Sequence, residues 1–575
     1  MTPGPQRAPR APWIVLAIAL LLRLPALQWD FFVDDHGVQL VVEGRIEHPT
    51  LRPWSAFDFG SVPPAGSQAE RVSGLPWWTS PDWKVRFFRP IPSLTHWLDN
   101  ALFGRNAMLQ HATSLAWFAT LLVALLALYR AAQVPERLVP WALAVFAFDD
   151  GSLFPVAWLA NRNALIEATF AVTASLAALR AGPRPSFAGV ALALACALGA
   201  CLSKESGVAA PLLVSALLAR GEGRAARLGA LAGLVMSCAY VAFLLGCGYG
   251  TRSDFYLTPW GDPVHYGVRL VEMSVLGALS VFGPFAVDAP MFFEELYAPW
   301  LAVALIVGGA LCVLAWRSAR ALPLRWFLAT WTVLTLLPQA GAFPSDRLLF
   351  LPMVGAAPLV AALAAKAFDR APWKQRLLPA AVALLAVPLS GLMQLARGAG
   401  FVALIDKTNA AAVSLEVPND GQPHDALVFQ SGSLMSMLSP EPVWKFRTGR
   451  EDLQIHPLQV GPRAVRITTV EASAFELCFE SQELLDRPFE RVFLAGNASL
   501  EKGQHWRHRA FEVEVVEVDR ELGRSTLRVR LPEPIASARW CFLTWREGAF
   551  RRFEMPAPGA TLQLPEATPL DPLLP

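Results

Sequence analysis

The chain has 575 residues, of which 54% are hydrophobic and only 17% are charged, whereas soluble domains carry about 25% charged residues. Its 49 basic and 47 acidic residues give a net charge of +2, so no excess of positive charge points to nucleic acid as a partner. This composition excludes a disordered chain, a collagen-like repeat and a disulfide scaffold, and it indicates a polytopic membrane protein.

The first apolar run covers residues 13–28 and follows Arg7 and Arg10. Because no small-residue cleavage site clearly follows this run, we interpret it as a retained first span rather than a removed signal peptide. Residues 30–105 are polar, aromatic and rich in proline, which is too long for a simple turn. We therefore predict a long outer loop after the first span.

This loop opens with two adjacent acids, Asp34 and Asp35. Partial desolvation at a membrane boundary raises the pKa of a carboxyl group, which suits it to act as a general base. Acids are also common in outer loops, so the pair by itself is weak evidence of a site. A divalent cation held by the pair is an alternative, but no third acid in the sequence obviously completes a metal site, and we assign neither a metal nor another cofactor.

The remaining apolar runs bring the total to about eleven spans, each with the roughly 20 apolar residues that a bilayer requires or slightly fewer. The run at 267–287 carries Arg269 and Glu272, so we expect a re-entrant or interfacial helix there. The expected spans after the first lie near residues 108–129, 138–157, 164–180, 187–202, 206–219, 228–247, 299–316, 326–340, 348–365 and 377–395.

Basic residues mark alternate short loops between these runs, and the positive-inside rule places such loops in the cytoplasm. The N-terminus is then inside, and the long first loop and the tail lie outside the cytoplasmic (inner) membrane. The loop residues that set this orientation are Arg130, Arg137, Arg180, Arg184, Arg220, Arg224, Arg227, Arg317, Arg320, Arg325, Lys366, Arg370, Lys374 and Arg376.

Polar residues interrupt the apolar sequence at several outer-face breaks, and such residues are costly at membrane depth unless they face a cavity or a partner. Arg162, Lys204 and Arg347 lie at three of these breaks, and together they would suit a phosphate or diphosphate. Alternatively, Lys204 with Glu205 and Asp346 with Arg347 are simple surface charge pairs. No Gly-rich phosphate loop or Cys-x-x-Cys pair is present.

From about residue 400 the apolar residues alternate with charged ones, which is typical of half-buried strands. We predict strands at 511–515, 527–531 and 539–545, and a small α/β portion that opens at 425–429. The domains expected are a membrane domain at 1–399 and an extracytoplasmic β-rich domain at 400–575. Cys478 and Cys541 form a disulfide or are two buried strand cysteines, and the sequence leaves both readings open.

The order of several short motifs resembles the GT-C glycosyltransferases, membrane enzymes that use polyprenyl-phosphate sugars. The similarity covers residues 1–395 and is greatest to the transmembrane, tetratricopeptide-linked O-mannosyltransferase group and its bacterial relatives. The motifs are Phe-Val-Asp-Asp after the first span, Phe88-Arg-Pro90, Phe154-Pro-Val-Ala-Trp-Leu-Ala-Asn-Arg162, Ser203-Lys-Glu205 and Asp346-Arg-Leu-Leu-Phe-Leu-Pro352.

The resemblance implies a GT-C-like fold, a first-loop acid as catalytic base (Asp34 or Asp35) and a donor phosphate held by basic residues, with Arg89 added to the set. Glu205 and Asp346 then support the cations. The chain departs from the group at Phe154, where the group has His, and at Asp346, where it has Glu. It also has no repeat array, so acceptor recognition cannot be carried over.

The function expected is inverting transfer of a sugar, a hexose such as mannose, from a polyprenyl-phosphate donor in the bilayer to an extracytoplasmic protein or glycan. One alternative is a transporter or lipid flippase, which predicts paired halves with broken helices and charges deep in the spans. Another is a non-catalytic envelope protein whose tail binds a partner. The charges gather on one face, which argues against the transporter.

Overall fold

The fold was taken from a computed structural model that describes residues 10–46, 52–62, 75–289, 294–432, 440–480, 484–485, 490–496 and 498–568. The chain forms two compact units. Unit 1 comprises residues 1–30, 87–250 and 258–402, and unit 2 comprises residues 31–86, 251–257 and 403–575. The segment at 31–86 thus folds with the C-terminal part, whereas the expected domain division placed it with the membrane part.

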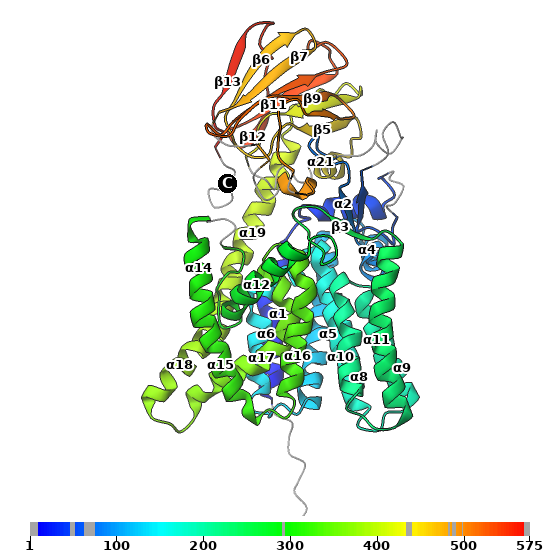
Figure 1. The fold of residues 1–575 in the computed structure, drawn as a ribbon, viewed down its shortest axis with the longest axis vertical. Helices are drawn as coiled ribbons and strands as arrows, with labels where there is room; N and C mark the ends of the chain where they lie inside the picture. The colour runs from blue at the N-terminus through cyan, green and yellow to red at the C-terminus, as the bar shows by residue number, and fades with distance from the viewer. Residues whose placement is uncertain are drawn as a thin grey trace, which may run out of the picture. The chain divides into compact units, whose positions relative to one another are not determined.

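Unit 1 is helical, and its long helices lie side by side (Figure 1). The neighbours in contact include α8 with α9 and α5, α16 with α17, and α10 with α11. The described helices are α1 (Ala11–Arg23), α4 (Pro90–Phe103), α5 (Ala107–Ala131), α6 (Val139–Phe148), α7 (Leu153–Ala157), α8 (Arg162–Arg180), α9 (Phe187–Cys201), α10 (Ala209–Leu218), α11 (Gly223–Gly246), α12 (Pro263–Ser280), α14 (Tyr297–Val303), α15 (Gly309–Ser318), α16 (Arg325–Leu336), α17 (Phe350–Ala364), α18 (Trp373–Leu384) and α19 (Ser390–Val413), whose residues from 403 onward belong to unit 2.

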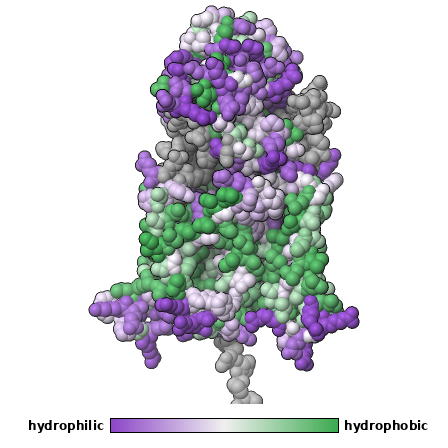
Figure 2. Space-filling model, viewed as in Figure 1, coloured by the Kyte–Doolittle hydropathy of each residue, from purple (hydrophilic) through white to green (hydrophobic). Residues whose placement is uncertain are grey.

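Six helices in the described ranges are long and apolar enough to cross a membrane, and the bent pair of α6 and α7 gives a seventh. About eleven spans were expected. The other four expected runs correspond to α8, which contains Glu167, and to the shorter helices α9, α10 and α16. Figure 2 shows a band of hydrophobic side chains over the helices of unit 1, with hydrophilic side chains gathered at one end of it.

Two breaks in these helices place polar residues inside unit 1. Between α6 and α7 the axis bends by 65°, and a Cβ added at Gly151 in this bend would lie 2.6 Å from the backbone oxygen of Asp346. Between α9 and α10, a Cβ added at Gly207 would lie 2.1 Å from the backbone oxygen of Ala200. Real Cβ atoms do not approach so closely, so only glycine lets the neighbouring backbone lie this near at either break.

Unit 2 contains two larger sheets, as the alternating sequence of the tail predicts. In the antiparallel sheet of order β13-β6-β7-β10-β9-β8, the buried residues of β9 and β10 alternate with exposed ones because one face packs on the core. Its strands are β6 (Val465–Glu471), β7 (Ala474–Phe479), β8 (His505–Arg507), β9 (Glu512–Asp519), β10 (Arg524–Arg530) and β13 (Thr561–Leu564).

The second sheet has the order β12-β11-β4-β5, in which β11, β4 and β5 are parallel and β12 is antiparallel. Helix α21 (Pro440–Thr448) joins β4 to β5, so the α/β portion expected at 425–429 is confirmed. The strands are β4 (His424–Val428), β5 (Leu453–Pro457), β11 (Trp540–Arg546) and β12 (Ala549–Arg552). Cys478 and Cys541 lie on strands of different sheets and are free thiols.

The first-loop segment contributes helix α2 (Asp34–Val42) and two strands of a small sheet to unit 2. This sheet has the order β1-β2-β3 and is built from β1 (Asp58–Ser61), β2 (Lys84–Arg86) and β3 (Gly250–Arg252). Helix α2 packs against α21, and the Trp77 and Trp78 side chains belong to the hydrophobic core of the C-terminal sheets. This burial of aromatic area explains why the segment folds with the tail rather than as a free loop.

Candidate functional site

Lys204 stands at the break between α9 and α10. Its backbone is extended, and a 3-10 turn at Glu205–Val208 follows it and leads into α10. Within the described residues Lys204 forms no ion pair. Its ammonium is attracted by the carboxylates of Glu167 and Glu205 and repelled by the guanidinium groups of Arg89 and Arg347. We refer to these five side chains as the Lys204 cluster. Burial lowers the pKa of the Lys204 ammonium, and a bound anion would favour its charged form.

Arg89 precedes α4 and pairs with Glu205. The Arg89 Nη2 donates to Glu205 Oε2 at 2.7 Å, and Arg89 Nε donates to the same carboxylate at 3.1 Å. The guanidinium also lies 4.2 Å from the centre of the Phe87 ring. These contacts orient the Arg89 guanidinium, and the Glu205 carboxylate balances its charge.

Arg347 lies in a 3-10 turn at Asp346–Leu349, just before α17. Its guanidinium lies 5.4 Å from the ring centre of Trp158 and 6.0 Å from that of Phe343. It pairs with no carboxylate in the part of the chain that the structure describes. A guanidinium held over aromatic rings keeps its donors available, so Arg347 is suited to bind an anion.

Glu167 is a member of the cluster that the sequence motifs did not indicate. It lies fully buried on α8, and its carboxylate faces the Lys204 ammonium and the Ser206 hydroxyl without a hydrogen bond of normal geometry. A buried carboxylate without such bonds needs an explanation. A glutamate inside an otherwise apolar helix was the available signal in the sequence.

Arg162 does not fit the role that the sequence suggested, contact with the donor phosphate. It is completely buried, and its Nε donates to Ser114 Oγ at 2.8 Å, its Nη1 to Asp99 Oδ2 at 2.5 Å and its Nη2 to the Gln110 carbonyl at 2.6 Å. A charge in a low-dielectric interior is stable only when it is paired, and Asp99 supplies the partner. Arg162 therefore links α4, α5 and α8.

Asp34 and Asp35 occupy the first turn of α2 in unit 2 and have different surroundings. Asp35 is 2% exposed, and its Oδ2 accepts a hydrogen bond from the Phe32 N–H at 2.9 Å. Asp34 is half-buried. The preceding Val33 has a φ of 44°, a strained conformation for a β-branched residue and one that often accompanies functional sites. Asp35 thus holds this turn through its hydrogen bond with the Phe32 N–H.

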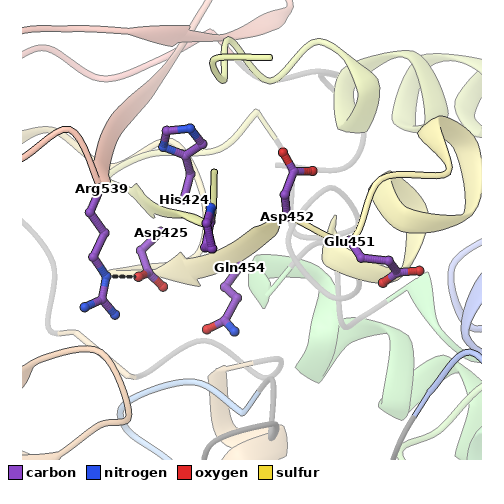
Figure 3. A pocket seen from close by; sticks show the side chains of 7 residues that line it. His424, Asp425, Glu451, Asp452, Gln454 and Arg539 are labelled. Atoms are coloured by element: carbon purple, nitrogen blue, oxygen red, sulfur yellow. Dashed lines mark hydrogen bonds and ion pairs between the residues drawn. The ribbon is translucent and has the colours of Figure 1, made fainter. Parts of the chain in front are cut away.

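Unit 2 also contains a polar cavity of about 350 Å³, at the starts of the parallel strands β4, β5 and β11. We call it the Asp425 cavity. Figure 3 shows Arg539 directed at Asp425, and Asp425 also accepts from His456 Nε2 at 2.6 Å. The cavity is lined by Pro423, His424, Asp425, Glu451, Asp452, Gln454 and Arg539.

The carboxylates of this cavity are already paired. Asp452 binds Arg450 at 2.6 Å, and Glu451 lies 3.7 Å from Lys445. The hydrogen bonds and charges of His456 and Arg539 outweigh the effect of burial and hold the pKa of the Asp425 carboxyl below its usual value. In the described ranges, no group of three or more His, Cys, Asp or Glu side chains is arranged to hold a metal ion.

No family model matches the chain, and no curated protein matches it. Solved structures do match. The apo oligosaccharyltransferase of Archaeoglobus fulgidus is 13% identical over 78% of this chain and 64% of that chain, with a TM-score of 0.43. The same enzyme, AglB, in complex with an inhibitory peptide and a dolichol-phosphate, is 14% identical over 79% and 65%, with a TM-score of 0.44.

The arabinofuranosyltransferase AftD from Mycobacteria is 14% identical over 79% of this chain and 32% of that chain, with a TM-score of 0.40. This chain thus spans less than two thirds of the archaeal enzyme. The neighbours are glycosyltransferases, the class that the sequence motifs resemble, and the apolar helices make this chain a multi-pass membrane protein.

Proposed function

We propose that this protein transfers a sugar from a polyprenyl-phosphate donor in the bilayer to a protein or glycan outside the cytoplasm. The observation that carries the proposal is the Lys204 cluster. Two of its cations, Lys204 and Arg347, lack a carboxylate within ion-pair distance among the described residues. A third cation, Arg89, is oriented by its ion pair with Glu205. Cations arranged in this way at the ends of apolar helices suit the phosphate of a lipid.

The reaction is a single inverting displacement. A hydroxyl oxygen of the acceptor attacks the anomeric carbon of the sugar, and the bond between that carbon and the phosphate oxygen breaks. The acceptor proton passes to a carboxylate, and the polyprenyl phosphate leaves with an additional negative charge. Lys204 and Arg347 would stabilise this charge as it develops, which is usually the largest electrostatic contribution to such a reaction.

Asp34 is the base in this proposal. It is less buried than Asp35, whose carboxylate accepts the Phe32 N–H. The sugar is proposed to be a hexose, and the inward N-terminus and outward tail follow from the basic loops. We also propose that the protein lies in the inner membrane, with its basic loops facing the cytoplasm.

The test is transfer from a panel of polyprenyl-phosphate sugars by the purified protein in lipid nanodiscs. Asp34→Asn should lower the rate by about 10²–10⁴-fold, the usual range for loss of a general base. Asp35→Asn should have a much smaller effect, because an asparagine oxygen still accepts the Phe32 N–H. Asp82→Asn serves as the control, since Asp82 is an exposed aspartate of the same unit.

Full activity in Asp34→Asn, in Asp35→Asn and in the double variant would remove the first loop from the mechanism. Movement of the lipid across the bilayer with its sugar still attached would instead support a transporter. No transfer from any donor of the panel, together with no binding of polyprenyl phosphate, would contradict the proposed enzyme altogether.

A further inference from the structure

Arg397 on α19 is a charged residue that the sequence motifs did not indicate. Its Nη1 donates to Asp346 Oδ2 at 2.9 Å and to Asp150 Oδ2 at 3.1 Å, and its Nη2 lies 3.7 Å from Asp288 Oδ2. We call these four side chains the Arg397 cluster. The three aspartates come from three separate stretches of unit 1, so a single guanidinium connects parts of the chain that lie far apart in the sequence.

Two of the three aspartates stand where a helix is broken or begins. Asp150 lies in the bend between α6 and α7, and Asp346 lies in the turn before α17. These two places touch through their backbones, as the 2.6 Å between a Cβ at Gly151 and the Asp346 oxygen shows. Asp288 follows α12. Arg397 therefore lies at the junction of two turns that are already in close backbone contact.

A second residue of α19 fixes the same junction. Gln394, which is 2% exposed and one turn before Arg397, donates through Nε2 to Ser152 Oγ at 2.9 Å and to the Asp149 carbonyl. Ser152 also accepts from Arg23 Nη2 on α1 at 2.5 Å. The bend between α6 and α7 is thus held from two helices, so α19 is not free to move independently of the bend.

The Asp346 carboxylate connects Arg397 with the Lys204 cluster, because Asp346 is the neighbour of Arg347 in the chain. Its Oδ2 accepts from Arg397, and its Oδ1 accepts from the Val287 N–H at 2.8 Å. Arg347 follows Asp346 in the same 3-10 turn, and its guanidinium lies over Trp158. With both oxygens of Asp346 bound, the backbone of this turn is fixed, and so is the point from which the Arg347 side chain extends.

We propose that Arg397 is a positioning residue, which holds Asp346 and thereby sets Arg347 for the donor phosphate. The inference rests on the proposed function, because it assigns Arg347 to the phosphate. Without Arg397, the three aspartates would repel one another in a low-dielectric surrounding, and the turn that carries Arg347 would shift. Arg397 itself need not touch the donor.

The experiment measures binding of a polyprenyl monophosphate to the full chain in nanodiscs. Arg397→Gln should weaken binding about tenfold, and Asp346→Asn should weaken it by a similar factor. The double variant should be no weaker than either single one, because both changes remove the same restraint. Arg397→Gln should also have little further effect in a chain that already carries Arg347→Gln. Arg320→Gln, at an exposed arginine, serves as the control.

A general loss of structure would act differently. It would lower binding in the Arg347→Gln background as much as in the wild type, and it would raise the KM for donor and acceptor alike, whereas the proposal expects only the donor KM to rise. Independent, multiplying effects of Arg397→Gln and Arg347→Gln would overturn the proposal, as would unchanged binding in Arg397→Gln.

If Arg397→Gln does not fold, Arg397→Lys carries the same test. A lysine keeps the charge but cannot bridge several carboxylates, so binding should again fall and again only while Arg347 is present. Unchanged binding in Arg347→Gln and Lys204→Gln would mean that the proposed phosphate site itself is absent. Weaker binding in those two variants with unchanged binding in Arg397→Lys would reject the positioning role alone.

Discussion

The Lys204 cluster and the Asp425 cavity are both polar groups of charged side chains, but their charges are balanced in different ways. At the Asp425 cavity, Asp425 binds His456 and Arg539, and Asp452 binds Arg450. In the Lys204 cluster only Arg89 has a carboxylate partner at hydrogen-bond distance among the described residues, namely Glu205. The cavity is therefore complete without a ligand, whereas the cluster retains charge that a ligand can neutralise.

The two places therefore differ in whether a ligand would meet charge that the fold leaves unbalanced. The partner and the hydrogen bonds of a paired ion already compensate for the hydration free energy that it lost on leaving water, so a ligand adds little stabilisation. A buried cation that forms no ion pair has not regained the hydration energy that it lost. An anion that reaches it therefore gains a strong, charge-assisted interaction. The following predictions test this difference.

The largest effect is expected where a paired and fully buried charge loses its partner. Arg162→Met leaves Asp99 buried without a counter-charge, which should lower the free energy of unfolding by about 3–5 kcal/mol. Thermal unfolding in detergent measures the loss. Any protein that remains folded should bind polyprenyl monophosphate with normal affinity, and a selective loss of that affinity would show that Arg162 does contact the donor.

The next effect concerns the unpaired cations. Lys204→Gln or Arg347→Gln removes one charge-assisted contact worth about 1.5–3 kcal/mol, so the Kd for polyprenyl monophosphate should rise roughly tenfold to a hundredfold. Gln454→Ala at the Asp425 cavity is the matched control and should leave this Kd unchanged. An equal rise in Kd for the variants of the cluster and of the cavity, or no rise for any of them, would contradict the proposed difference between the two sites.

A smaller effect, of opposite sign, is expected at Glu167. This carboxylate competes with a phosphate for the Lys204 charge, so Glu167→Gln should strengthen binding of polyprenyl monophosphate by about threefold to tenfold. Isothermal titration can detect a change of this size. If Glu167→Gln weakens binding instead, the carboxylate orients Lys204 rather than competing with the donor.

The smallest effect is a pH dependence in unit 2. Burial lowers the pKa of the His456 imidazole below its usual value. The unfolded chain therefore takes up this proton first as the pH falls, and the stability that His456 contributes is fully present above about pH 6.5 and declines below it. Relative to the intrinsic exchange rate at each pH, hydrogen exchange of peptides from β4 and β5 should speed up between pH 7 and pH 5, because their protection falls.

His456→Gln is the control for this dependence. A glutamine can still donate to Asp425 but does not titrate, so the acceleration of exchange at low pH should be smaller in this variant. A part of it should remain, because burial also lowers the pKa of His508, whose ring centre lies 5.0 Å from that of His456. An equal acceleration in the variant and the wild type would assign the pH dependence to other groups.

The sequence alone predicted the features that depend on near neighbours in the chain. Apolar runs predicted helices, and the alternation at 511–515 and 527–531 predicted β9 and β10. Both patterns are local, since the period of a helix or strand decides which side chains share a face. The same reasoning located the breaks that carry Lys204 and Arg347, because charged residues are conspicuous within apolar sequence.

Only the tertiary structure decided which charges are paired. Arg162 pairs with Asp99, which lies 63 residues away in the chain, and Arg397 pairs with Asp150, which lies 247 residues away. No local sequence pattern predicts either pair. The same holds for residues 31–86, which fold with the tail because their tryptophans complete its core. An ion in a protein interior pairs with whatever charge the fold brings near it, so its role follows from distances in space rather than from its position in a motif.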